Sequence, residues 1–229
     1  MMEGRRIPGG LFLALEGPEG GGKTVHSRHL QEWLAGLGFD TLLTREPGGT
    51  PLGEEIRRLL LAPELPALAP SAELFLFLAA RAQLTREVIV PALEAGRLVI
   101  TDRYATSTLV YQGYGLGLDL TSIGAMNRLA TGGLEPTLTI ILDIDPLRGL
   151  ARRRGTQLVT DRIEGRDLDF HSRVRQGYLA EARANSERFR VVDASPSENE
   201  VWAAVKRGVA SFLSRQFPET AAFFKFTSK

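Results

Sequence analysis

Cysteine is absent from the 229 residues of this chain, and histidine is scarce. Without cysteine, the protein has no disulfide scaffold, no thiolate zinc site and no cysteine nucleophile. The three histidines, His26, His29 and His171, form no dense cluster in the sequence. His26 and His29 could share one face of a helix, but we interpret them as surface side chains rather than as a metal site.

An excess of one charge and long apolar runs are also lacking. The 28 basic residues nearly balance the 27 acidic ones, so net charge gives no support for binding to nucleic acid or to a membrane surface. No stretch reaches the roughly 18 uninterrupted apolar residues of a membrane-spanning helix. The short apolar run after Gly10 leads directly into a glycine-rich loop, which indicates a strand rather than a signal peptide. We therefore expect a cytoplasmic protein with no nucleic-acid or membrane partner.

Short apolar runs alternate with helical patterns along the chain. The runs are nearly continuous, as in strands that are buried on both faces of a parallel sheet. The predicted strands are 11–15, 41–43, 98–100, 138–142 and 191–192. The predicted helices are 23–36, 52–61, 71–95, 120–131, 146–153, 167–186 and 197–214. This alternation predicts an α/β fold with a doubly wound, parallel five-stranded sheet.

Two segments fit this pattern less well. Residues 152–167 are rich in arginine and glycine without a clear period, which indicates a mobile loop over a surface. The tail 218–229 carries Phe223, Phe224 and Phe226, and the sequence does not decide whether it docks or frays.

A phosphate-binding loop follows the first predicted strand. Residues 17–24 read G-P-E-G-G-G-K-T and match the pattern G-x-x-x-x-G-K-S/T. Backbone N–H groups of such a loop form an anion nest, which the next helix N-terminus reinforces. Lys23 would reach the β- and γ-phosphates of ATP, and the Thr24 hydroxyl would bind Mg²⁺. The predicted nucleotide-binding residues are Gly17, Glu19, Gly20, Gly21, Gly22, Lys23 and Thr24.

Polar residues also follow the second and third predicted strands. Arg45 comes after one, and Asp102 with Arg103 after the other. Ligands of open α/β sheets bind beyond the carboxyl ends of the strands, so these side chains would face one crevice. Asp102 could hold Mg²⁺ through water or orient the attacking group. The two arginines could clamp a second phosphate, that of the acceptor; the alternative for each is a surface ion pair.

Phe77 and Arg81 lie four residues apart in a predicted helix and so share one face. A ring and a planar donor side by side would suit a nucleobase. The alternative for Phe77 is a place in the hydrophobic core.

The combination of these motifs resembles the thymidylate kinase (dTMP kinase) family, over about residues 11–212. The similar stretches are the P-loop with an acid at its third position, T-R-E-P-G-G-T at 44–50, A-A-R-A-Q at 79–83, D-R-Y-A-T-S at 102–107, Y-Q-G at 111–113 and D-R-I-E at 161–164. The resemblance implies a single P-loop kinase domain over 1–229, of the nucleoside monophosphate kinase type. It also implies ATP and Mg²⁺ as cofactors, phosphoryl transfer to dTMP giving dTDP and ADP, and a homodimer.

The resemblance further implies roles for individual residues. Glu19 would accept a hydrogen bond from the deoxyribose 3′-hydroxyl, and Arg45 and Arg103 would grip the dTMP phosphate. Asp102 would help to place Mg²⁺ and the acceptor. Around the base, Phe77 would stack on thymine and Arg81 would hydrogen-bond its edge. Thr108 falls where some members use asparagine to contact the base. Beside the sugar, Tyr111 would disfavour ribonucleotides. Val25 departs from members that carry a second hydroxyl residue after the P-loop threonine.

The arginine-rich loop at about 152–167 would be the LID that closes over ATP. Some members of the family carry a catalytic arginine directly after the P-loop acid, whereas this chain has Gly20 there. The LID must then supply the arginine, and the candidates are Arg152, Arg153, Arg154, Arg162 and Arg166. We predict Arg162 as the catalytic arginine, together with Lys23 and Asp102, because it lies in the matched D-R-I-E stretch.

Two alternative functions remain at this point. One is a kinase for another nucleoside monophosphate, or for a deoxynucleoside, on the same fold. The other is a P-loop protein that binds a nucleotide without turnover. The second arginine clamp argues against an acceptor without phosphate, and the LID arginines argue against a non-catalytic protein.

Overall fold

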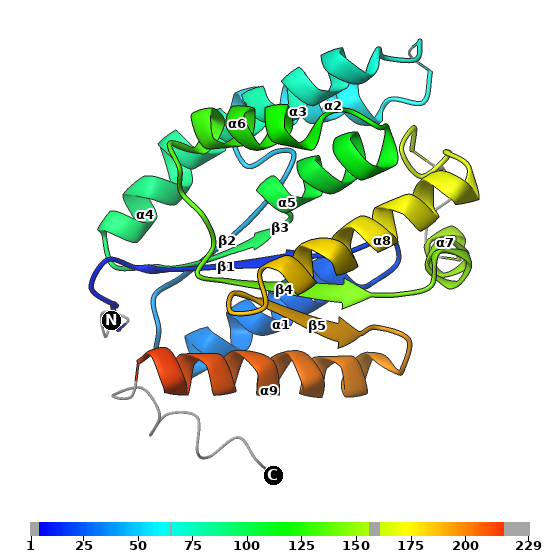
Figure 1. Cartoon of the computed structure of the whole chain (residues 1–229). Coiled ribbons are helices and arrows are strands. Elements are labelled where there is room, and N and C mark those ends of the chain that lie inside the picture. The colour runs from blue at the N-terminus through cyan, green and yellow to red at the C-terminus, as the bar shows by residue number, and fades with distance from the viewer. Residues whose placement is uncertain (1–4, 65, 156–160, 218–229) are drawn as a thin grey trace.

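Five parallel strands form the centre of the protein in the computed structural model, which describes residues 5–64, 66–155 and 161–217 (Figure 1). The strands are β1 (Leu11–Glu16), β2 (Thr41–Arg45), β3 (Leu98–Asp102), β4 (Leu138–Asp143) and β5 (Phe189–Asp193). They lie in the order β2-β3-β1-β4-β5, and all the pairings are parallel. The predicted doubly wound, parallel five-stranded sheet is therefore confirmed.

Helices cover both faces of this sheet. They are α1 (Lys23–Gly36), α2 (Pro51–Leu61), α3 (Pro70–Leu84), the π-helical η1 (Thr85–Ile89), α4 (Val90–Glu94), α5 (Ala105–Thr108), the π-helical η2 (Leu109–Gly115), α6 (Leu120–Thr131), α7 (Pro146–Arg154), α8 (Leu168–Ala184) and α9 (Glu198–Gln216). Figure 1 shows α1 and α9 on one side of the sheet, with α3 to α6 and α8 on the other. No helix of the described segments is long and apolar enough to cross a membrane.

Alternating side chains of β1 supply both halves of the core. Leu13 and Leu15 point to the face where α1 and α9 pack. Phe12 and Ala14 point to the opposite face, where they pack with residues of α3 and α4. Because the side chains on both faces of β1 are apolar, its sequence is the continuous apolar run described above.

Two helical stretches differ from the sequence-based expectation. The predicted helix 71–95 is present, but its middle is the π-helical η1, where the Val90 N–H bonds to the Thr85 carbonyl. This wider turn lies just before Pro91, which has no N–H and whose ring crowds the carbonyl four residues earlier. No helix was expected over 105–115, because its threonines, Val110 and glycines have low helix propensity. The structure nevertheless forms α5 and η2 there.

Polar side chains fix the starts of several helices at the edge of the sheet. Asp145 accepts hydrogen bonds from the N–H groups of Leu147 and Arg148, as expected for an N-cap before a proline. Asp167 accepts one from Phe170 at the start of α8. The arginine-rich segment thus lies between two capped helices, α7 and α8. Residues 156–160 of the predicted LID lie outside the described residues, as does the tail 218–229.

Candidate active site

A cavity of about 340 Å³ lies beyond the carboxyl ends of β1, β2 and β3. Residues from the P-loop, the β2–α2 loop, α2, α3, the β3–α5 loop, η2, α7 and the segment 161–164 line it. The predicted site residues among the lining are Glu19, Gly20, Gly22, Lys23, Thr24, Arg45, Phe77, Asp102, Arg103, Thr108 and Tyr111. The fold therefore brings the P-loop and the predicted acceptor residues to one cavity, as parallel strands require.

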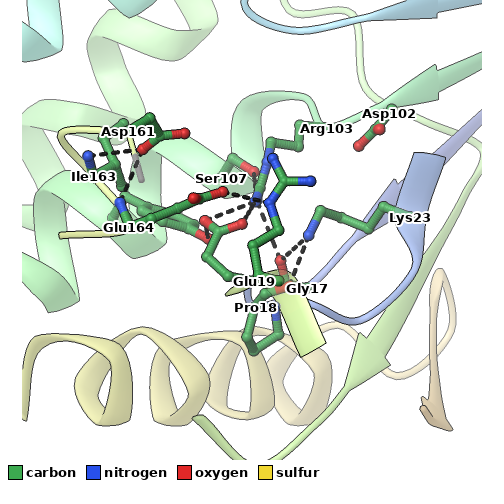
Figure 2. Close-up of polar contacts among 12 residues, drawn as sticks. Gly17, Pro18, Glu19, Lys23, Asp102, Arg103, Ser107, Asp161, Ile163 and Glu164 are labelled. Atoms are coloured by element: carbon green, nitrogen blue, oxygen red, sulfur yellow. Dashed lines mark hydrogen bonds and ion pairs between the residues drawn. The ribbon is translucent and has the colours of Figure 1, made fainter. Parts of the chain in front are cut away.

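The P-loop turns tightly between β1 and α1. Gly17, Gly20 and Gly22 have φ values of +134°, +72° and +83°, which glycine adopts far more readily than other residues. The Lys23 ammonium group donates hydrogen bonds to the carbonyls of Gly17 (2.9 Å) and Pro18 (2.7 Å), as Figure 2 shows. Burial lowers the pKa of Lys23 to about 8, despite the nearby carboxylates. A phosphate beside this lysine would favour its charged form.

Two oxygen ligands suited to Mg²⁺ meet beside the P-loop. The Thr24 hydroxyl donates a hydrogen bond to Asp102 Oδ2 at 2.6 Å. Mg²⁺ in nucleotide sites takes one or two protein oxygens and completes its shell with water and phosphate. Within the described ranges, no cluster of three or more His, Cys, Asp or Glu side chains could hold a metal alone. The two oxygens of the Thr24–Asp102 pair suit a metal that arrives with a nucleotide.

Arg103 and Glu19 form a partly buried ion pair that lines the cavity. Arg103 Nη2 lies 2.9 Å and 3.0 Å from the two carboxylate oxygens of Glu19 (Figure 2). The Tyr111 hydroxyl donates to the same carboxylate at 2.6 Å. Burial alone would raise the pKa of Glu19, but Arg103 and Lys23 outweigh it and hold that pKa at about 2. Glu19 is thus an ionised acceptor at physiological pH.

Two further arginines face the cavity near the end of β2. Arg45 is half exposed and pairs with Glu54 at 3.1 Å. Arg57 on α2 also lines the cavity and donates to the Pro47 carbonyl at 2.9 Å. Burial and the neighbouring Arg45 lower the pKa of Arg57. The sequence analysis missed Arg57, because its spacing in an amphipathic helix looks like that of any solvent-facing arginine.

Phe77 and Thr108, which were predicted to contact the base, both line the cavity, as does Tyr111. Arg81 is placed differently from the expectation. Its guanidinium is 1% exposed and does not line the cavity. It lies beneath Thr108, with its Nη1 donating to that hydroxyl at 2.7 Å and its Nη2 paired with Glu46 at 2.5 Å. In this structure Arg81 supports the wall of the site from behind.

Arg162 also lies away from the cavity. Its guanidinium donates to backbone carbonyls at the end of α2, at 2.7 Å for Leu60 and 3.5 Å for Leu59. These carbonyls belong to the last turn of α2 and have no partner within the helix, so Arg162 caps that helix end. Arg162 is not among the residues that line the cavity. The placement differs from the expectation that Arg162 is the catalytic arginine.

Other arginines of the same region do reach the cavity. Arg152 and Arg153 line it from the last turns of α7. Arg153 forms an ion pair with Glu164, whose N–H is in turn bonded to the Asp161 carboxylate. Arg166 instead pairs with the buried Glu73 at 2.5 Å. The side chain of Arg154 lies outside the described set.

The histidines are placed only partly as expected. His29 is only partly exposed and its ring packs against Trp202, whereas His26 is 2% exposed and its ring packs beside Gly22 of the P-loop. The expectation of a surface side chain is therefore wrong for His26: it falls on the face of α1 that packs beneath the P-loop. Burial lowers its pKa and favours the neutral ring.

Polar residues in the cavity wall and behind it were also not predicted from the sequence. Glu16, Ser107 and Tyr178 form a hydrogen-bonded group around Arg103. Gln112 lines the cavity and donates to Glu73 at 2.9 Å. The position of Glu16 could have indicated this group, because it is a charged residue that directly follows an apolar strand and precedes the P-loop.

The parallel sheet, the P-loop after β1 and the arginines on the opposite side of the same cavity define a P-loop kinase of the nucleoside monophosphate kinase class. Residues 15–205 match the family model described as Thymidylate kinase. The chain belongs to the thymidylate kinase family.

Individual relatives agree with this assignment. A thymidylate kinase from Deinococcus radiodurans is 50% identical over 202 residues, covering 86% of this chain and 96% of that protein. A thymidylate kinase from Thermomicrobium roseum is 50% identical over 205 residues, covering 86% and 97%. The crystal structure of thymidylate kinase from Ehrlichia chaffeensis superposes with a TM-score of 0.73 at 32% identity, covering 88% of this chain and all of that one.

Proposed function

We propose that this protein transfers the γ-phosphoryl group of ATP to dTMP and releases dTDP and ADP. The observation that carries the proposal is the single cavity that joins a P-loop to a cluster of arginines and aromatic side chains from β2, α3, β3 and η2. Its lysine and glycine loop suits a triphosphate, and its arginines suit a second phosphate. The family relationship supports dTMP as the acceptor.

The residues of the donor half position the nucleotide and neutralise its charge, because phosphoryl transfer depends mainly on these two effects. Lys23 exchanges its two backbone carbonyls for the β- and γ-phosphates of ATP. Thr24 and Asp102 hold Mg²⁺ when the nucleotide is bound. The metal ion would neutralise charge on the phosphates.

The residues of the acceptor half hold dTMP in line with the γ-phosphate. Arg103, supported by Arg45, grips the acceptor phosphate, and Glu19 accepts a hydrogen bond from the 3′-hydroxyl. Phe77 stacks on the base beside Thr108, and Tyr111 closes the space at the sugar 2′ position. Since Tyr111 also bonds to Glu19, one contact fixes both the aromatic ring and the carboxylate.

Arg153 is the LID arginine that we propose for the transferring phosphoryl group. It lines the cavity from the end of α7, whereas Arg162 is bonded to the end of α2. Its partner Glu164 keeps it at the cavity wall until the nucleotide enters. The proposed single kinase domain thus has a LID at about 152–167, with Arg153 as its catalytic side chain and Arg162 as its anchor.

A panel of monophosphates tests the acceptor assignment. We expect the highest kcat/KM for dTMP, a lower value for dUMP, which lacks the methyl group, and a much lower value for UMP, whose 2′-hydroxyl meets Tyr111. Release of ADP, measured by a coupled assay with each acceptor, checks this order. A higher kcat/KM for CMP, AMP or thymidine would show that the acceptor is wrong, and ADP release that no acceptor stimulates would show that the protein is not a kinase of this class.

We also propose a cytoplasmic homodimer. Phe75 on α3 and Leu129 on α6 are 59% and 85% exposed, and these two helices pack against each other. Exposed apolar side chains on two neighbouring helices suit contact with a second copy of the chain. Light scattering should give twice the chain mass of 25.1 kDa for the natural protein, and the chain mass for a Phe75→Asp, Leu129→Asp double variant. An unchanged mass in the double variant would place the interface elsewhere.

A further inference from the structure

Glu16 is a fully buried carboxylate at the end of β1, one residue before the P-loop. It is not among the residues that line the cavity. Its Oε1 accepts hydrogen bonds from the backbone N–H groups of Tyr104 (2.8 Å) and Ser107 (3.1 Å). Its Oε2 accepts from the hydroxyls of Ser107 (2.5 Å) and Tyr178 (2.9 Å). Four donors from two separate elements, α5 with its preceding loop and α8, therefore converge on one side chain.

Each of the two hydroxyls has one hydrogen to donate. Ser107 Oγ lies 2.5 Å from Glu16 Oε2, and the Tyr178 hydroxyl lies 2.9 Å both from that oxygen and from Ser107 Oγ. Glu16 therefore draws the hydroxyl hydrogens toward itself and away from Arg103. The oxygen lone pairs are then left for Arg103, whose Nη1 donates to Ser107 Oγ and to the Tyr178 hydroxyl, both at 3.2 Å. Burial raises the pKa of Glu16, whereas its hydrogen bonds and the charge of Arg103 oppose that rise. In its ionised form Glu16 only accepts, so it holds the hydroxyls in the orientation that the guanidinium needs.

Glu16 also holds the backbone that follows Arg103. Arg103 has a φ of +73°, a left-handed conformation that is costly for a residue with a side chain. Tyr104, the next residue, is the N-cap of α5, and its side chain makes no capping hydrogen bond. The Glu16 carboxylate accepts from the helix start in its place. The strained backbone of Arg103 is thus held by the same group that orients its guanidinium.

We propose that Glu16 is a positioning residue that orients Arg103 toward the acceptor phosphate through the hydroxyls of Ser107 and Tyr178. The proposal rests on the function proposed above, in which Arg103 binds that phosphate. Glu16 touches neither substrate. It acts on the acceptor half of the site, although it adjoins the donor loop in the sequence.

Glu16→Gln in the full-length protein tests this role. The side-chain amide has one acceptor oxygen and donates through its nitrogen, so it cannot accept from both hydroxyls and both backbone N–H groups. We expect KM for dTMP to rise at least about tenfold and KM for ATP to stay within about threefold. The matched control is Glu181→Gln, which alters a similar contact between a tyrosine (Tyr114, 3.1 Å) and a carboxylate on α8, away from Arg103. The control should leave both KM values within about twofold.

A double variant separates positioning from a structural role. If Glu16 acts through Arg103, then adding Glu16→Gln to Arg103→Ala should lower kcat/KM for dTMP by no more than about threefold further. Losses that multiply in the double variant, or equal increases in both KM values for Glu16→Gln, would overturn the proposal.

Tyr178→Phe provides an independent test if Glu16→Gln lacks a cooperative thermal transition. This change removes one hydroxyl and keeps the ring, and we expect KM for dTMP to rise about three- to tenfold while KM for ATP stays within about twofold. An unchanged KM for dTMP would overturn the proposal. Failure of the proposed function would look different, because the natural protein would then not phosphorylate dTMP.

Discussion

We expect Arg103→Ala to lower kcat/KM for dTMP by roughly 30- to 1,000-fold, because the variant loses a charge-assisted clamp on the acceptor phosphate. This range corresponds to about 2–4 kcal/mol of transition-state stabilisation, somewhat more than one hydrogen bond to a charged group. The loss also leaves the partly buried Glu19 carboxylate with Tyr111 and Lys23 but without its arginine partner. Steady-state kinetics with dTMP varied at saturating ATP measure the effect.

The affinity of Arg103→Ala for ATP, measured without dTMP, should by contrast change by less than about threefold. In the proposed function, Lys23 and the loop backbone hold the donor phosphates, and Arg103 does not. Arg58→Ala is a suitable control, since this arginine is exposed on α2 and pairs with its helical neighbour Glu55. A folded Arg103→Ala variant that lost ATP binding would assign Arg103 to the donor site.

The second large effect concerns the LID. Arg153→Ala should lower kcat by about 10²-fold or more, within or below the range measured for arginine fingers, because Arg153 would stabilise charge on the transferring group. KM for dTMP should stay within about threefold, since the acceptor contacts come from other elements. Single-turnover measurement of the phosphoryl-transfer rate at saturating substrates checks the result.

Arg162→Ala is the matched variant from the same segment. We expect it to lower kcat by less than about tenfold and to reduce thermal stability, because it removes hydrogen bonds to the last turn of α2. If Arg162→Ala lost 10²-fold in kcat while Arg153→Ala stayed within threefold of the natural enzyme, the assignments would be reversed.

The sequence predicted where the strands lie but placed their ends too early. The apolar runs stop at 15, 100 and 142, whereas β1, β3 and β4 continue to Glu16, Asp102 and Asp143. Each extension consists of polar residues, which a pattern based on burial of apolar side chains does not assign to a strand. These residues at the strand ends include Asp102 of the proposed metal pair and the buried Glu16. The apolar pattern therefore ends where the functional part of the sheet begins.

The roles of arginines were harder to predict than their presence. Arg81 and Arg162 were both expected to meet ligands, and in this structure both bond to the protein. Arg81 is buried because Glu46, which follows a different strand, supplies its counter-ion. Arg162 is held by carbonyls at the end of a helix 102 residues earlier in the chain. A partner so distant in sequence, or a backbone partner, leaves no local signal.

The close contact between Gly20 and Gly149 ties the shape of the P-loop to the position of α7. Gly20 has a φ of +72°, and a Cβ there would lie 2.1 Å from the Gly149 carbonyl oxygen. A Cβ on Gly149 would lie 2.2 Å from the Glu19 carbonyl oxygen. An engineered arginine at position 20 would therefore need a compensating movement of α7 before it could add a cation to the loop.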